Sequence, residues 1–132
     1  MPQNNSRDKL FIMDSFCKLK ELYKLVYDLE KQIYAIHQLS VNECMTMCAI
    51  NRGFRSAGDL AKETSQSKSR MSAILSALEK KKLIQRKFDD RDKRKTFFVL
   101  TALGKEKVKE LESTTFEVPE IEIKGKSVFS EK

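Results

Sequence analysis

The chain has 132 residues, a formal net charge of +7, 40% hydrophobic residues and 34% charged residues. That length corresponds to one domain and is enough to bury a core without disulfides. Only 4 Gly and 2 Pro interrupt it, which favours helices over a β-sandwich with many turns. No apolar run approaches the roughly 20 residues that span a bilayer, and the polar N-terminus lacks a signal-peptide core. We therefore expect a cytoplasmic protein with no membrane partner.

The surplus positive charge is confined to one stretch of the chain. Residues 55–95 contain 13 Lys and Arg and 6 Asp and Glu, a net of +7, while the remaining residues balance to zero. Charge that only maintains solubility would be scattered along the sequence. A surplus this concentrated indicates a surface that meets a polyanion.

A long helix is predicted for Leu10–Gln38, because its apolar positions step by three and four residues in a heptad-type stripe. The stripe consists of Leu19, Leu22, Val26, Leu29, Ile33 and Ile36, with Ile12 and Phe16 extending it backwards. Three tyrosines widen it into a second face: Tyr23, Tyr27 and Tyr34. This is more apolar area than one small domain needs, so a helix–helix dimer contact is expected; packing within its own domain is the alternative.

Two capping signals mark the next two helices. Ser40 and Glu43 form a capping box, and the helix that they open ends near Gly53. Ser56 and Asp59 open a short second helix, and the polar residues 64–67 then form a turn. Two short helices joined by such a turn are typical of a helix-turn-helix.

The following helix, from about Ser67 to Lys82, has two contrasting faces. Apolar residues at i, i+3, i+4 and i+7 are expected in the core: Met71, Ile74, Leu75 and Leu78. The opposite face is small and polar, so the N-terminal half of this helix can enter a major groove closely. The DNA contacts expected from this helix are Ser67, Lys68, Ser69, Arg70, Ser72, Ala73 and Ser76.

A β-hairpin is predicted after this helix. Leu83–Phe88 and Thr96–Leu100 are strand-like, and the charged segment Asp89–Lys95 between them forms the tip of a wing. Helical periodicity resumes at Thr101 and fails from Ser113. The tail beyond it contains Pro119 and alternating apolar residues that fit either a short strand or a loose segment: Val118, Ile121 and Ile123.

The sequence contains no motif typical of a catalytic or metal-binding site. There is one His, His37, and there is no phosphate-binding glycine motif, no G-x-S-x-G and no paired metal-ligand spacing. We therefore predict that the protein is not an enzyme and has no catalytic residue, metal site or cofactor. Cys44 and Cys48 share one helical face and are predicted to be small core residues. A metal pair, or a redox switch that includes Cys17, is the alternative.

Residues 39–111 resemble the MarR family of winged-helix transcription regulators. The segment LAKETSQSKSRMSAILSALEKKKLIQR resembles that family's helix-turn-helix, and RKFDDRDKRKTFFVLTALGKE resembles its wing. The wing positions that carry the resemblance are Arg86, Asp89, Asp92, Arg94, Leu100, Thr101 and Gly104. Members of the family usually close with a long C-terminal helix or helix pair. Here the last helix is short, and the tail is a candidate to replace what is missing.

The resemblance implies that Arg94 enters the minor groove, held by an ion pair with Asp92, and a narrow minor groove does attract Arg. Arg91 and Lys93 would lie beside it on the wing, and the aspartates of the tip would fix the Arg side chains. Further phosphate contacts are expected from Arg55, Arg86 and Lys87.

The resemblance also implies a dimerisation arm and an effector. The arm would be the long N-terminal helix, through Leu19, Leu22, Val26, Leu29 and Ile33. A small aromatic effector would bind between the arm and the DNA-reading lobe. The lining expected for it, which plain core packing also explains, is Phe16, Tyr23, Met45 and Cys48.

The sequence thus predicts a mainly α fold with a small β-hairpin wing: a winged helix-turn-helix with a long N-terminal dimerisation helix. Residues 1–38 would form the dimerisation helix, 39–100 the DNA-binding region, and 101–132 a helix and tail at the dimer interface. The predicted function is a sequence-specific regulator of transcription that binds double-stranded DNA as a homodimer on an inverted repeat and is released by a small ligand. The alternative is a winged-helix module that docks an acidic protein. RNA binding is disfavoured, because no aromatic stacking platform accompanies the basic stretch.

Overall fold

The computed structural model describes residues 13–116, 122–123 and 126–127. The chain forms two compact units: a central unit, Ile33–Thr115, and a flanking unit made of the segments that precede and follow it in the sequence. Helix α1 (Met13–His37) begins in the flanking unit and ends in the central one. The first residues of the predicted helix, Ile12 among them, lie outside the described residues.

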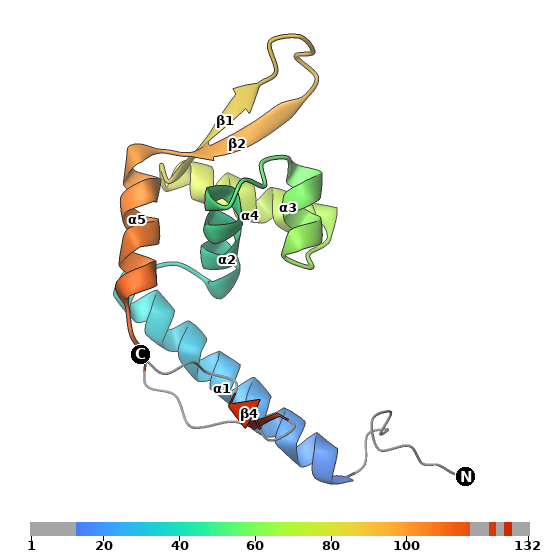
Figure 1. Cartoon of the computed structure of the whole chain (residues 1–132), viewed down its shortest axis with the longest axis vertical. Helices are drawn as coiled ribbons and strands as arrows, with labels where there is room; N and C mark the ends of the chain where they lie inside the picture. Colours follow the sequence, from blue (N-terminus) through green and yellow to red (C-terminus); the bar gives the residue numbers. More distant parts are fainter. Residues whose placement is uncertain (1–12, 117–121, 124–125, 128–132) are drawn as a thin grey trace, which may run out of the picture. The chain divides into compact units, whose positions relative to one another are not determined.

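The central unit contains the elements of a winged helix (Figure 1). In chain order they are α2 (Val41–Asn51), α3 (Ala57–Glu63), α4 (Lys68–Lys80), β1 (Ile84–Phe88), β2 (Thr96–Leu100) and α5 (Ala102–Ser113). Both predicted caps are present, and Ser67 caps α4 in addition. Ser40 and Glu43 exchange side-chain and backbone hydrogen bonds of 2.8 and 3.0 Å, while Ser56 and Ser67 each accept from a backbone amide in the first turn of their helix.

The core of the central unit lies between these helices and the base of the hairpin. Every apolar residue predicted for the inner face of α4 is buried in it. The most completely buried side chains of the core are Leu39, Met47, Ile50, Leu60, Met71, Leu75 and Leu78. The backbone amide of Phe98 donates to the carbonyl oxygen of Arg55, 2.9 Å away, and so ties the segment between α2 and α3 to the hairpin.

The hairpin is antiparallel and in register from Ile84 opposite Leu100 to Phe88 opposite Thr96. It projects beyond the helices of the central unit in Figure 1, so its tip has room to reach a partner. The first strand begins at Ile84, one residue later than predicted, and is preceded by Leu83. The carbonyl oxygen of Leu83 accepts from the amide of Thr101, 3.0 Å away, at the start of α5.

Gly104 allows α5 to approach Leu83 closely. A methyl group at Gly104 would overlap the carbonyl oxygen of Leu83, so no larger residue fits without a shift of the backbone. Thr101 caps this helix by accepting from the amide of Gly104 at 3.0 Å, and its hydroxyl donates to Lys82 at 2.7 Å. Gly53, by contrast, is required for its conformation, since its φ of +110° is disfavoured for other residues.

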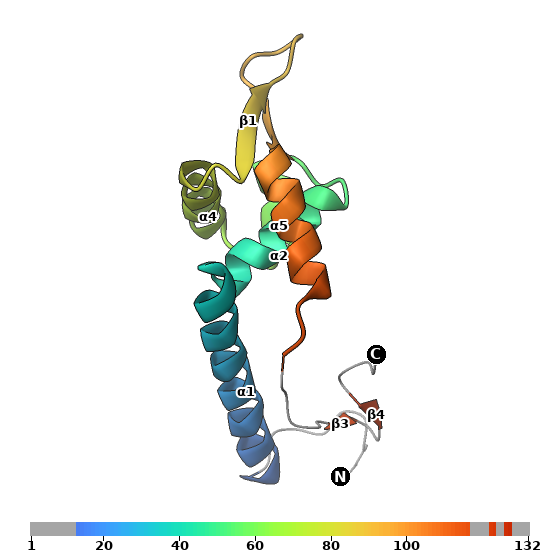
Figure 2. The same ribbon diagram turned by 90° about the vertical axis from the view of Figure 1, so that its left-hand side faces the viewer.

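The chain enters and leaves the central unit at one place. His37, the last residue of α1, packs with a buried side chain against the C-terminal end of α5, where its Nε2 lies 3.0 Å from Oγ1 of Thr114. The Thr114 hydroxyl donates to the carbonyl oxygen of Glu110 at 2.6 Å, so it accepts from His37. The neutral imidazole therefore carries its proton on Nε2. Figure 2 shows α5 crossing α2, against which it packs.

Four of the predicted dimer residues of α1 lie in the flanking unit, and Ile33 is the first residue of the central one. All five are half-buried or exposed; Val26 is 43% exposed. The buried leucine of this part of α1 is Leu25, which does not belong to the predicted stripe. After α5, the described part of the tail forms two short antiparallel strands, β3 (Glu122–Ile123) and β4 (Lys126–Ser127). Val118, Pro119 and Ile121 lie outside the described residues. Among the described helices, none has the length and apolar character needed to cross a membrane.

Candidate nucleic-acid interface

The exposed face of α4 carries the residues that the sequence predicts for the major groove. Lys68, Ser69, Arg70, Ser72, Ala73 and Ser76 are all exposed, as is the cap residue Ser67. The first turn of α4 contains no acidic residue, so the positive end of the helix dipole is unopposed there. Ser67 accepts a hydrogen bond from the amide of Arg70, and its hydroxyl proton is still able to donate to an anion.

The tip of the hairpin holds Arg94 in a fixed orientation. Its Nε lies 3.1 Å from Oδ1 of Asp92 and its Nη2 lies 3.3 Å from Oδ2, while its backbone amide also donates to Oδ1. The hydrogen bonds from the Arg94 side chain and then from its amide lower the pKa of Asp92 below its ordinary value. The Arg94 side chain is nevertheless 90% exposed. Asp92 therefore orients a guanidinium that remains open to solvent.

Asp89 acts differently from the prediction for the aspartates of the tip. Its Oδ1 accepts from the backbone amides of Arg91 and Asp92, at 2.8 and 3.2 Å, instead of holding an Arg side chain. The amide of Asp89 also donates to the carbonyl oxygen of Lys95 at 3.0 Å. Asp89 thus shapes the backbone of the tip, and Arg91 and Lys93 are exposed on it.

The further phosphate candidates lie on opposite faces of the hairpin. Arg86 pairs with Glu79 at 3.0 Å and lies over the ring of Phe98, 5.3 Å from its centroid. It therefore joins the hairpin to the end of α4. Arg55 and Lys87 instead line a hollow of about 480 Å³ between α2, the hairpin and the start of α5. Lys105 lines the same hollow. It could not be predicted from the sequence, because a single lysine on an exposed helical face belongs to no recognisable motif.

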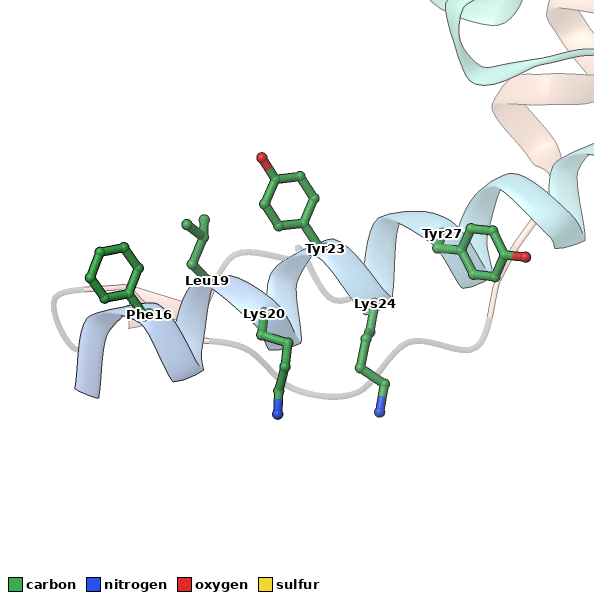
Figure 3. Close-up of a pocket in the computed structure, with 6 residues that line it drawn as sticks. All are labelled: Phe16, Leu19, Lys20, Tyr23, Lys24 and Tyr27. Atoms are coloured by element: carbon green, nitrogen blue, oxygen red, sulfur yellow. The ribbon is translucent and has the colours of Figure 1, made fainter. Parts of the chain in front are cut away.

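The predicted effector lining is divided between the two units. Phe16 and Tyr23 belong to the flanking unit, where they line an apolar hollow of about 450 Å³ on α1 together with Leu19, Lys20, Lys24 and Tyr27. In Figure 3, Phe16, Leu19 and Tyr23 point to one side of α1, and Lys20 and Lys24 point away from them. Met45 and Cys48 lie on α2 in the central unit, exposed and half-buried respectively. A pocket shared by all four residues stays a prediction.

The paired cysteines fit the prediction of packing residues better than that of a redox switch. Cys44 and Cys48 are half-buried, and Cys44 packs against the core. Burial, followed by the nearby Cys48 and Glu43, raises the pKa of Cys44 to about 11, and burial also raises the pKa of Cys48. Few thiolates then form near neutral pH. No cluster of potential metal ligands occurs among the residues that the structure describes.

An exposed helix face and a hairpin arranged in this way define a winged-helix protein. A family model described as the MarR family matches residues 37–95. These residues form the helix-turn-helix and most of the wing, so this part of the chain is similar to the MarR family.

Solved structures extend the likeness to most of the chain. AbsC, a MarR family transcriptional regulator from Streptomyces coelicolor, is 27% identical over 79% of this chain and 74% of its own, with a TM-score of 0.64. The DNA complex of MepR from S. aureus has a TM-score of 0.63 at 22% identity, over 80% of this chain and 75% of that one.

A third similar structure is BpsR of Bordetella bronchiseptica, whose DNA binding is regulated by 6-hydroxynicotinic acid. It has a TM-score of 0.56 at 22% identity, over 72% of this chain and 76% of that one. No curated protein matches the chain significantly. The predicted mainly α fold, the hairpin wing and the long N-terminal helix are confirmed.

Proposed function

We propose that the protein is a transcription regulator that binds double-stranded DNA in a sequence-specific manner. The observation that carries the proposal is the exposed face of α4, which is small and polar along its length and cationic at its start. Side chains of this size let the helix backbone come close to base edges in a major groove. The wing supports the same function, because Asp92 presents Arg94 in an orientation suited to an adjacent minor groove.

Contacts with phosphates supply the remaining affinity in this proposal. Lys68, Arg70, Arg91 and Lys93 are exposed around the two reading elements. Arg55, Lys87 and Lys105 surround the hollow beside the hairpin, and the described residues offer none of them an ion pair. Such cations position a protein on DNA without reading its sequence. Arg86, already paired with Glu79, is expected to contribute less.

The proposal includes a homodimer formed through α1. The apolar stripe of this helix is incompletely covered within its own unit, and a second copy offers a matching stripe. A twofold dimer places two recognition helices on half-sites one helical turn apart, roughly 34–36 Å. The preferred operator is therefore an inverted repeat. Analytical ultracentrifugation together with footprinting on a selected site tests this, and protection of one isolated half-site would contradict it.

A small aromatic effector completes the proposal. The support is the apolar hollow on α1, which is lined by the aromatic rings of Phe16, Tyr23 and Tyr27. BpsR, with a similar fold, responds to a compound of this class. Titrating benzoate-type acids into the protein–DNA complex should release the DNA. If none of these acids releases the DNA at millimolar concentration, the proposed effector is wrong. The proposed DNA-binding function would be unaffected by that result.

Salt dependence provides the central test. With 6–10 phosphate contacts, affinity falls by roughly 10³–10⁵ between 50 and 200 mM salt, because each neutralised phosphate releases counterions. The experiment first selects bound sequences from random duplexes and then titrates the protein with selected and scrambled duplexes at several salt concentrations. It measures the dependence of DNA affinity on salt and the ratio of the affinities for the two duplexes. An acidic protein as the partner would instead leave all duplexes bound equally weakly, and the small side chains of α4 argue against such a flat contact.

A further inference from the structure

Lys81, which follows α4 directly, is exposed, but its ammonium group is held by three acceptors of the protein. Its Nζ lies 2.9 Å from both carboxylate oxygens of Glu43 and 3.0 Å from the carbonyl oxygen of Gln38. An ammonium group has three donors, so these three acceptors use all of them. Lys81 belongs to the basic stretch of residues 55–95, but these hydrogen bonds leave it no donor for a phosphate.

Glu43 is the reason for this arrangement. It lies in the first turn of α2 and is only 6% exposed, so its carboxylate requires compensation. Lys81 supplies the opposite charge, and the amide of Ser40 donates a further hydrogen bond at 2.8 Å. Removing Lys81 would leave the buried carboxylate of Glu43 without a charged partner, whereas Lys81, with 39% of its side chain exposed, would regain water. The pair therefore fixes the C-terminal end of α4 to the first turn of α2.

The same turn of α2 also holds the other end of α4. Nε2 of Gln66 donates to Oδ1 of Asn42 at 3.1 Å. Gln66 immediately precedes Ser67, the residue that caps the recognition helix, and Asn42 precedes Glu43 in α2. Two adjacent residues of α2 thus reach the two ends of a 13-residue helix whose inner face is already packed on the core.

We propose that these two contacts, Asn42–Gln66 and Glu43–Lys81, set the roll and the position of α4 in the DNA groove, and that Lys81 and Gln66 are positioning residues for sequence recognition. The inference rests on the proposed function. Hydrogen bonds to base edges demand close alignment of the helix, whereas contacts with phosphates tolerate small displacements. Loosening the two contacts should therefore reduce discrimination between sequences more than it reduces attraction to DNA.

The test compares three variants by their affinity for the selected duplex and for a scrambled duplex. Glu43→Gln with Lys81→Met removes both charges together, leaving the net charge unchanged and no ion unpaired. Gln66→Met removes the contact at the other end of α4. Lys80→Met is the control, because it deletes a neighbouring lysine that is exposed and makes no hydrogen bond or ion pair within the described part of the chain.

We expect the ratio of selected to scrambled affinity to fall roughly ten-fold in the double variant and to fall in Gln66→Met, by analogy with coupling across one ion-pair network. The salt slope of both variants should match that of the native protein. In Lys80→Met the ratio should stay at its native value. Circular dichroism fixes the folded fraction, since a loss of folded protein lowers both affinities equally and leaves the ratio unchanged.

Two results would overturn the inference while the proposed function stands. One is a native ratio in both the double variant and Gln66→Met at full folding. The other is a smaller salt slope in the double variant, which would make Lys81 a phosphate contact. If the double variant does not fold, Gln66→Met decides alone. A native protein that fails to prefer any selected duplex overturns the proposed function, and the inference falls with it.

Discussion

Asp92 and Arg94 are joined by three hydrogen bonds, two to the guanidinium and one to the backbone amide, across a single intervening residue of the wing. An acidic residue thus lies beside the cation predicted to enter DNA. A more positive surface usually binds a polyanion more tightly. At this position the negative charge of Asp92 is instead expected to favour binding, because it orients Arg94.

Asp92→Asn is therefore expected to weaken binding although it makes the protein more positive. The freed Arg94 side chain must be ordered on binding, which we estimate to cost roughly five-fold in affinity. Asp90→Asn is the matched control: it adds the same charge at an exposed neighbour whose side chain makes no described hydrogen bond. Fluorescence anisotropy on one duplex compares the two. Tighter binding by Asp92→Asn would contradict this prediction. It would show that repulsion between Asp92 and DNA outweighs the orientation of Arg94 by Asp92.

Arg94→Ala should weaken binding and leave folding intact, because the side chain is 90% exposed and, among the described residues, hydrogen-bonds only to Asp92. Loss of one minor-groove arginine is expected to cost roughly ten-fold in affinity for the selected site. Arg86→Ala provides the contrast, since it removes the contacts with Glu79 and Phe98 and should lower the melting temperature. Unchanged affinity of Arg94→Ala would remove the wing from the DNA interface.

Stability should fall as pH drops below 6.5, through His37. Burial, followed by the positive charge of Lys107, lowers the pKa of His37 in the folded protein below its ordinary value of 6.5, against the opposing effect of Glu110. Between the folded and the unfolded pKa of His37, the unfolded chain binds more protons than the folded protein. The contribution of neutral His37 to the free energy of unfolding is therefore fully present above pH 6.5 and is lost as the pH falls toward the lower pKa of the folded state. The slope is at most about 1.4 kcal/mol per pH unit.

His37→Gln isolates this contribution, because an amide can still donate to Thr114 but does not titrate. Urea denaturation at pH 7.5 and at pH 5.5 should show a smaller loss of unfolding free energy in the variant than in the native protein. Glu110, whose pKa is lowered mainly by its hydrogen bond with Lys107, stays ionised over this range. Equal losses in the two proteins would exclude His37 as the titrating group.

Gly104→Ala should destabilise the central unit by about 1–3 kcal/mol, as overpacking does, because the added methyl meets the backbone carbonyl of Leu83. Gly58→Ala is the control. It lies in α3 with open space around the position of its missing Cβ, so it should stabilise by up to about 1 kcal/mol. Chemical denaturation measures both. If both substitutions behave alike, α5 does not depend on this close approach.

Local signals explain why much of the fold could be predicted. The capping serines and the spacing of Met71, Ile74, Leu75 and Leu78 act within one or two helical turns, and the structure places these helix starts and core residues as expected. The polar face of α4 followed from the same periodicity. The boundaries of α2, α3 and α4 needed only adjustments of a residue or two, while the predicted start of the first helix lies outside the described residues.

Contacts between distant residues could not be predicted in this way. Lys81 and Glu43 are 38 positions apart, and Lys81 looked like one more cation of the basic stretch. Arg86 finds Glu79 and Phe98 only once α4 and the hairpin have packed together. Leu25 is buried although it lies outside the heptad-type stripe, because the partners that bury a side chain are not encoded in the period of its own helix. The Asp92–Arg94 pair was expected from the family resemblance.

The meeting of His37 with Thr114 means that the 83 residues of Ile33–Thr115 begin and end side by side. A structural unit closed in this way is a natural cassette. It can be inserted into a surface loop of an unrelated host, since such insertions are tolerated where the two ends adjoin. If the host protein is a twofold dimer, its geometry would set the distance between the two inserted DNA-binding units. The choice of host would then select the spacing between the half-sites of the operator.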